Sequence, residues 1–131
     1  MERSNYLHSE ITGLVLKAFF KVYNQLGYGF LEKVYENAMM IELRKMGLKC
    51  TQQTSIQVYY ETEKVGSYLA DIIVKDCVIL ELKAAENIAP EHEAQLVNYL
   101  RATDLEVGLL LNFGKSPNIP EKYFTNKFKK S

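Results

Sequence analysis

The spacing of apolar residues predicts two helices in the first third of the chain. From Ile11 to Leu26 apolar side chains recur every three or four residues, as in a helix with one buried stripe. Glycines at 27 and 29 interrupt the pattern, which resumes near Leu31 and runs to Gly47, a predicted left-handed C-cap. The predicted core positions are Leu14, Val15, Ala18, Phe19, Val22 and Tyr23, then Val34, Ala38, Met39, Ile41, Leu43 and Met46. We therefore expect an αα-hairpin.

After Gly47 the pattern changes to the alternation of strands. Ile56, Val58 and Tyr60 alternate with their neighbours and are of the β-branched and aromatic kinds that strands favour. Residues 61–66 are polar and predict a turn, whereas residues 68–74 and 78–82 are short apolar strands split by residues 75–77. These segments predict a three-stranded antiparallel meander.

The last third predicts a helix and a strand. Pro90 suits the first turn of a helix that runs to Ala102, with Ala94, Val97 and Leu100 facing the core. Residues 107–113 are continuously apolar, as in a strand covered on both faces. A strand–helix–strand order implies a right-handed crossover, so this strand should be parallel to a neighbour. The fold class expected is α/β (α+β), with a mixed four-stranded sheet flanked by helices.

Composition and charge narrow the class of protein. The chain has 131 residues, 47% of them hydrophobic, which fits a single domain spanning residues 1–131. Sixteen basic and sixteen acidic residues cancel, so nucleic-acid binding would have to depend on local charge. Residues 115–131 form a basic tail that is either solvated or in contact with phosphate; its charged residues are Lys115, Glu121, Lys122, Lys127, Lys129 and Lys130.

Cysteine, histidine and hydropathy patterns exclude other classes. Cys50 and Cys77 form no CxxC pair and His8 and His92 are far apart, which argues against zinc and thiol chemistry. No apolar segment has the length of a membrane span, and no basic segment precedes an N-terminal apolar run. We expect a soluble, cytoplasmic protein with no membrane partner.

The charged residues of the predicted meander are candidates for a functional site. Asp71 lies on one strand, and Glu81 and Lys83 lie on the next, two positions apart and therefore on one face. Asp71 lies directly opposite Glu81 if the connecting loop has three residues and is centred on Asp76. Charges inside a sheet are unfavourable unless they are paired, solvated or bound to a metal.

This arrangement suits metal-assisted hydrolysis. Two converging carboxylates raise each other's pKa, and an oxygen-seeking divalent cation such as Mg²⁺ removes that penalty. Lys83 could orient or deprotonate a water and stabilise charge on a phosphoryl oxygen. The alternative is a surface hairpin in which Glu81 and Lys83 form an exposed pair and Asp71 caps a strand end. The residues alone leave both open.

With these motifs the chain resembles the PD-(D/E)XK nuclease superfamily, whose restriction-endonuclease-like core has the same order of elements. The match is most specific to the GxxExxY protein family, whose motif is similar to GFLEKVY at residues 29–35. QLVNY at residues 95–99 resembles the QxxxY motif of RecB-type nucleases, and VGLLLNFG at residues 107–114 resembles the final core strand. Ala70 stands where the superfamily name has proline, a position that is loosely kept.

The resemblance implies roles for individual residues. Asp71, Glu81 and the backbone carbonyl of Leu82 would bind Mg²⁺, or Mn²⁺ in its place, and Lys83 would position the attacking water. Glu32 becomes a third acid that contacts the ion directly or through water, although acids near a helix start also favour the helix dipole. Gln95 would bind a phosphate or a water, or else lie on a solvated helix face. Tyr35 and Tyr99 would support the site or contact the substrate backbone.

The resemblance also implies an activity. We expect an Mg²⁺-dependent nuclease that hydrolyses phosphodiester bonds in nucleic acid, with DNA as the expected substrate and a 5′-phosphate product. The alternative is a catalytically weak nuclease-fold module that binds nucleic acid or a protein partner. A homodimer is also an option, with exposed aromatic residues in the interface; the candidates are Tyr59, Tyr60, Tyr68 and Phe113.

Overall fold

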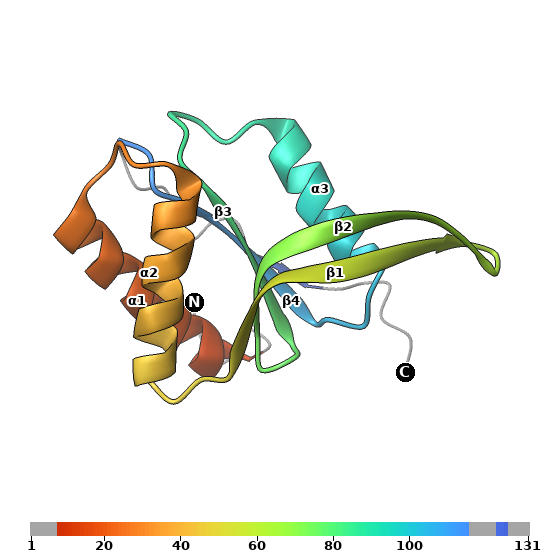
Figure 1. The fold of residues 1–131 in the computed structure, drawn as a ribbon, viewed down its shortest axis with the longest axis horizontal. Helices are drawn as coiled ribbons and strands as arrows, with labels where there is room; N and C mark the ends of the chain where they lie inside the picture. The colour runs from red at the N-terminus through yellow and green to blue at the C-terminus, as the bar shows by residue number, and fades with distance from the viewer. Residues whose placement is uncertain (1–7, 116–122, 126–131) are drawn as a thin grey trace.

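In the described part of the chain, three helices enclose a five-stranded mixed sheet from both faces (Figure 1). The computed structural model describes residues 8–115 and 123–125. The elements are α1 (Ser9–Leu26), α2 (Glu32–Lys45), β1 (Cys50–Tyr60), β2 (Glu63–Val74), β3 (Val78–Lys83), α3 (Pro90–Arg101), β4 (Val107–Asn112) and β5 (Tyr123–Thr125). The order confirms the predicted fold class of an antiparallel meander, a crossover helix and a parallel strand.

The sheet has the strand order β1-β2-β3-β4-β5, and β3 and β4 are its parallel pair. β5 pairs antiparallel with β4 and adds a fifth strand to the four expected. It lies within the segment that was predicted to be only a basic tail, because a three-residue strand is too short to show alternation. Lys115 is exposed, whereas the tail lysines at 122, 127, 129 and 130 lie outside the described residues.

Alternating residues of the sheet serve two cores. Leu80 and Leu82 pack with α1 and α2, whereas Ile79 packs on the other face with Leu96 and Leu100 of α3. This is the period of two that strands impose, and it buries β3 and β4 on both faces as expected.

Helix α2 buries Met39 and Leu43 as predicted, but two other positions predicted to face the core are exposed and Tyr35 is buried instead. Val34 and Ile41 are exposed, whereas Tyr35, Met39 and Leu43 are fully buried. A helical period is compatible with either neighbouring stripe, and the tyrosine stripe is buried because aromatic packing selects it. The Tyr35 ring stacks on Phe113 with 4.4 Å between ring centroids.

Two further expectations about burial need correction. In α3, Ala94 is exposed and Val97 only half-buried, whereas Leu96 and Tyr99 join Leu100 in the core. Phe113 is fully buried, so it cannot contribute to a subunit interface. The larger side chains gain more from burial, which decides the rotation of α3.

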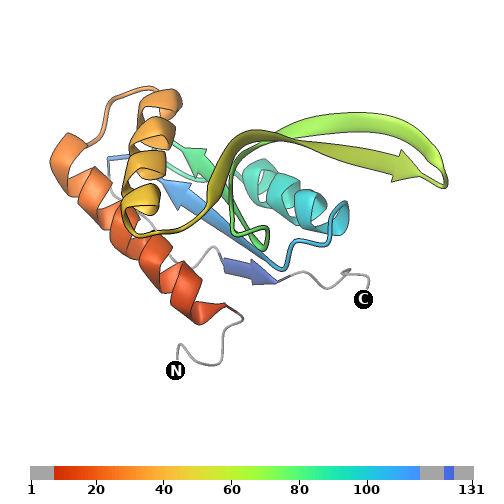
Figure 2. The ribbon, with the colours of Figure 1, turned by 60° about the horizontal axis from the view of Figure 1, so that its bottom comes forward.

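Strands β1 and β2 extend beyond the body as a two-stranded arm (Figures 1 and 2). The predicted turn at residues 61–66 is too long, because β2 already begins at Glu63 and the reversal is confined to residues 61 and 62. Glu61 adopts a left-handed φ of 60°, which allows this tight reversal. The arm stands beside α3 in both views and contributes one wall of a cavity described below.

A buried asparagine fixes the chain that follows β3. The side chain of Asn112 accepts hydrogen bonds from Ala85 N (3.0 Å) and Gly114 N (3.1 Å) and donates one to Ala85 O (2.8 Å). Phe113 N also donates to Lys83 O at 2.7 Å. These bonds fix the backbone at Lys83, the last residue of β3.

Gly114→Ala should destabilise the fold by about 1–3 kcal/mol, because overpacking a dense site forces backbone shifts. A Cβ at this position would lie 2.0 Å from Ala85 O. The free energy of unfolding in urea measures the effect. The matched control is Gly66→Ala, since nothing lies within 4 Å of a Cβ there. Equal stability of the two variants would contradict the close packing at Gly114.

Candidate functional site

The turn between β2 and β3 sets the register of the site. The paired residues Ile72 with Leu80 and Val74 with Val78 enclose a three-residue loop, as predicted. Lys75 and Asp76 of this loop adopt left-handed φ values of 52° and 58°. Continuing the same register by one residue places Asp71 opposite Glu81.

The backbone pairing between β2 and β3 ends at Ile72. Beyond it, the carboxylates of Asp71 on β2 and Glu81 on β3 lie between the two strands, at a place that we call the fork. Asp71 N donates to Glu81 Oε2 at 3.2 Å, and Leu82 N donates to Asp71 Oδ2 at 2.8 Å. Side-chain oxygens therefore accept bonds from two backbone groups across the fork. The structure brings the two acids together, as the register predicts.

The surroundings of the two acids disfavour their charged forms. Burial raises the pKa of Glu81 to about 8, and the charge of Asp71 adds to the effect. Burial also raises the pKa of Asp71, with the Leu82 N–H opposing it and the charge of Glu36 adding to it. The fork is therefore a place where a cation would be strongly favoured.

Lys83 carries a positive charge on β3, two residues after Glu81. It is half-buried, and its charge lowers the pKa values of both Asp71 and Glu81. Within the described part of the chain it forms no ion pair with an N···O distance of 4 Å or less. Its amine is not held by a carboxylate in this structure.

Sequence reasoning missed a second buried acid. Glu36 is only 4% exposed and accepts hydrogen bonds from Gln52 Nε2 (2.7 Å), Gln53 Nε2 (2.9 Å) and Lys33 Nζ (3.1 Å). It lies one helical turn after Glu32 and so shares a face with it. The four-residue spacing from Glu32 could have indicated that Glu36 belongs to the same site, but an acid on a helix is usually solvated.

Gln53 links this second acid to the fork. Its Nε2 donates to Glu36 Oε1 and, more weakly at 3.4 Å, to Asp71 Oδ1. The pairs Gln52 with Ile72 and Thr54 with Ala70 place Gln53 directly across from Asp71. Gln53 has a left-handed φ of 51°, which is unfavourable for a residue other than glycine. This strain accompanies a side chain that spans two carboxylates.

Glu32 and Tyr35 of the GFLEKVY motif have different surroundings. Glu32 is exposed, although its charge contributes to raising the pKa values of Asp71 and Glu81. The Tyr35 hydroxyl donates to Gly27 O at 2.6 Å and accepts from Phe30 N at 3.2 Å. Tyr35 therefore closes the loop between α1 and α2.

Helix α3 brings Tyr99 near the acids. Burial, followed by the charges of Glu81 and Asp71, raises the pKa of Tyr99 to about 12. The Tyr99 ring lies 5.3 Å from the ring of Tyr68 on the arm. Gln95 lies one turn earlier and is half-buried; no hydrogen bond between it and either acid is present among the described residues.

The arrangement defines how many acids can serve one ion. Across residues 8–115 and 123–125, no group of three or more His, Cys, Asp or Glu side chains is arranged to hold a metal ion. Glu32 is thus not gathered with Asp71 and Glu81 into a three-acid cluster. The fork offers the two carboxylates of Asp71 and Glu81, and the amine of Lys83 lies on the same strand as Glu81.

Comparison with known proteins adds one finding. The sequence model of a family described as the PD-(D/E)XK nuclease superfamily matches residues 9–123. No curated protein and no solved structure matches the chain. In the described residues, none of the helices has the length and apolar character needed to cross a membrane.

Proposed function

Because the chain belongs to the PD-(D/E)XK nuclease superfamily, we propose that it is a metal-dependent nuclease whose catalytic residues are Asp71, Glu81 and Lys83. One observation carries the proposal. The two carboxylates meet in the fork between β2 and β3, where each accepts a hydrogen bond from the opposing backbone. Glu81 is buried and Asp71 half-buried, and charges inside a sheet are unfavourable unless they are paired, solvated or bound to a metal.

The acids fit the divalent ion that nucleases of this superfamily generally use. Mg²⁺ is commonly bound by one or two carboxylates and keeps several waters, so the absence of a three-acid cluster among the described residues does not oppose it. The pKa of Glu81 is raised to about 8 because burial and the charge of Asp71 disfavour its anion, and a bound cation would offset both effects. Asp71, Glu81 and the Leu82 carbonyl would hold Mg²⁺, or Mn²⁺ in its place.

The residues around the fork would divide the work of hydrolysis. The bound ion would supply positive charge that polarises a phosphoryl oxygen. Lys83 would orient the attacking water and stabilise negative charge on the phosphate. Gln95 would hydrogen-bond a phosphate oxygen or a water, and Glu32 would act through water from the edge of the site. We propose DNA as the substrate and a 5′-phosphate as a product terminus.

Cleavage of a panel of labelled nucleic acids tests this function. Single-stranded, duplex and four-way-junction DNA, with RNA counterparts, would be incubated with the protein in Mg²⁺, Mn²⁺ or EDTA. We expect cleavage of at least one DNA substrate that requires the metal. Binding without cleavage in any metal would instead favour the alternative, a nuclease-fold binding module.

Gln53→Ala should reduce the cleavage rate by about tenfold to a hundredfold, as loss of a group that orients a metal ligand typically does. The change removes the hydrogen bonds from Gln53 to Glu36 and Asp71. Gln57→Ala is the matched control, because Gln57 lies on the same strand and its side-chain amide donates to Ser55 Oγ rather than to an acid. Rates measured across Mn²⁺ concentrations should show weaker metal activation for Gln53→Ala alone. Equal activation curves would contradict a positioning role.

A further inference from the structure

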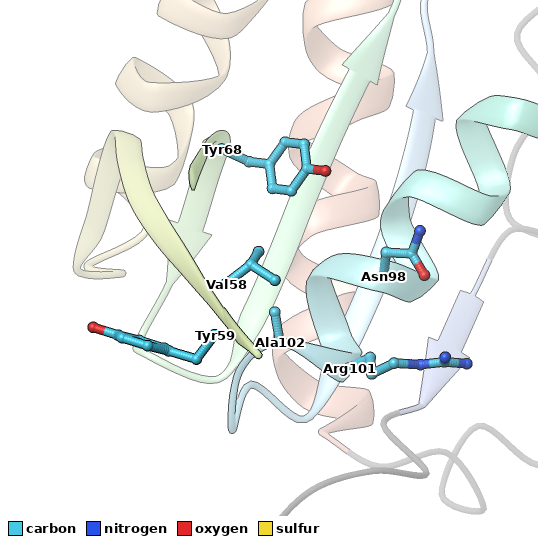
Figure 3. Close-up of a pocket in the computed structure, with 6 residues that line it drawn as sticks. All are labelled: Val58, Tyr59, Tyr68, Asn98, Arg101 and Ala102. Atoms are coloured by element: carbon cyan, nitrogen blue, oxygen red, sulfur yellow. The ribbon is translucent and has the colours of Figure 1, made fainter. Parts of the chain in front are cut away.

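A cavity of about 350 Å³ lies between the β1–β2 arm and α3 (Figure 3). Tyr68 and Val58 project from the arm toward the helix, which contributes Asn98 and Ala102 to the opposite wall (Figure 3). The side chains of Tyr59 and Arg101 also line the cavity, but they point outward at its rims (Figure 3). The walls are thus an aromatic ring, two small apolar groups and an amide.

The cavity is connected to the fork through one aromatic pair. Tyr68, in the cavity wall, lies 5.3 Å from Tyr99, ring to ring. The charges of Glu81 and Asp71 both act on the Tyr99 hydroxyl. Tyr68 is also three residues before Asp71 on β2, about 10 Å along the strand, so a ligand in the cavity would lie close to the acids, as a unit adjacent to the reacting group of one polymer would.

The chemistry of the walls suits a nucleobase. An aromatic ring offers a stacking surface to any base, and the Asn98 amide offers a donor and an acceptor to a base edge. Among the described residues no acid lines the cavity, and the Arg101 guanidinium at the rim is of the sign that attracts phosphate. The volume is at the small end of ligand cavities, which suits one base rather than a duplex.

We propose that the cavity between Tyr68 and Asn98 binds an unpaired base of the nucleic-acid substrate, next to the phosphate that a metal ion at Asp71 and Glu81 would hold. The proposal rests on the proposed function for its ligand class and makes that function more specific. A base can enter the cavity only when it is unstacked from a duplex. The substrates bound best would then be single strands, flaps or frayed ends.

Binding without cleavage tests the proposal separately from activity. Fluorescence anisotropy in EDTA would measure the affinity of a labelled oligothymidine about 12 nucleotides long, within the usual range of single-strand sites. A blunt duplex of equal length would be measured in parallel. The variants are Tyr68→Ala, Tyr68→Leu and Tyr68→Phe, with Tyr60→Ala as the control. Tyr60 is 68% exposed at the end of β1 and does not line the cavity.

We expect Tyr68→Ala and Tyr68→Leu to bind the single strand at least about fivefold more weakly, the effect of losing one stacked base. Tyr68→Phe and Tyr60→Ala should bind as the parent does, and the parent should prefer the single strand to the duplex. Tyr68→Leu keeps an apolar side chain beside Tyr99. If Tyr68→Ala fails to fold, the affinity of Tyr68→Leu for the single strand tests whether the aromatic ring binds a base.

The outcomes separate the two proposals. Unchanged affinity in Tyr68→Leu, or no single-strand binding by the parent protein, would overturn the base site even if the protein cleaves duplex DNA. Binding that depends on Tyr68, with no cleavage in any metal, would support the base site while the nuclease proposal fails.

Discussion

Glu81→Gln and Asp71→Asn should each reduce metal-dependent cleavage by at least about a hundredfold, the usual effect of removing one preorganised electrostatic group from an active site. Each change removes one of the two carboxylates that meet in the fork. The amide keeps an oxygen of similar size, so the fold should persist. Initial rates on the best substrate of the panel measure the effect, and circular dichroism checks the fold.

The control for this pair is Glu63→Gln, which removes an exposed carboxylate from the start of the strand that carries Asp71. It should cleave at the parent rate, since it lies far along β2 from the fork. Parent-like cleavage by Glu81→Gln would show that the fork is not the catalytic site.

Without metal, the protein should lose stability as pH rises from about 4.5 to about 8. The pKa of Glu81 is about 8 in the folded state, against 4.5 for an unperturbed glutamate. Between these values the unfolded chain releases the proton while the folded chain keeps it, so ionisation favours unfolding. The loss should be on the order of a few kcal/mol and complete above about pH 8. Urea unfolding across this range in EDTA measures it.

Glu81→Gln supplies the comparison, because its amide does not titrate and most of the pH-dependent loss should disappear. Mg²⁺ should restore stability to the parent protein at the alkaline end, since a ligand selective for the folded state stabilises it by mass action. A parent protein whose stability is flat across this range would contradict the raised pKa.

The sequence could predict the geometry of the fork because that geometry depends on short-range rules. The apolar strands on either side of residues 75–77 predict a three-residue loop, and a loop of that length places Asp71 across from Glu81. The alternation along β3 then assigns Leu80 and Leu82 to one core and Glu81 to the opposite face.

Other features depend on tertiary packing that the sequence does not display. The exposure of Val34 and Ile41 on α2 was not predicted, because they fit a helical stripe with Met39 as well as Tyr35 does. The buried Glu36 could be recognised only once Gln52 and Gln53 were known to face it from β1. A polar strand gives no sign of which acid it will meet.

The most direct test of the site is calorimetric measurement of Mn²⁺ binding to the metal-free protein at a pH above 8, where Glu81 of the parent protein is ionised. We expect one Mn²⁺ site in the parent protein and at least about tenfold weaker binding in Asp71→Asn and in Glu81→Gln. Parent-like Mn²⁺ affinity in both variants would contradict a shared ion at these two carboxylates.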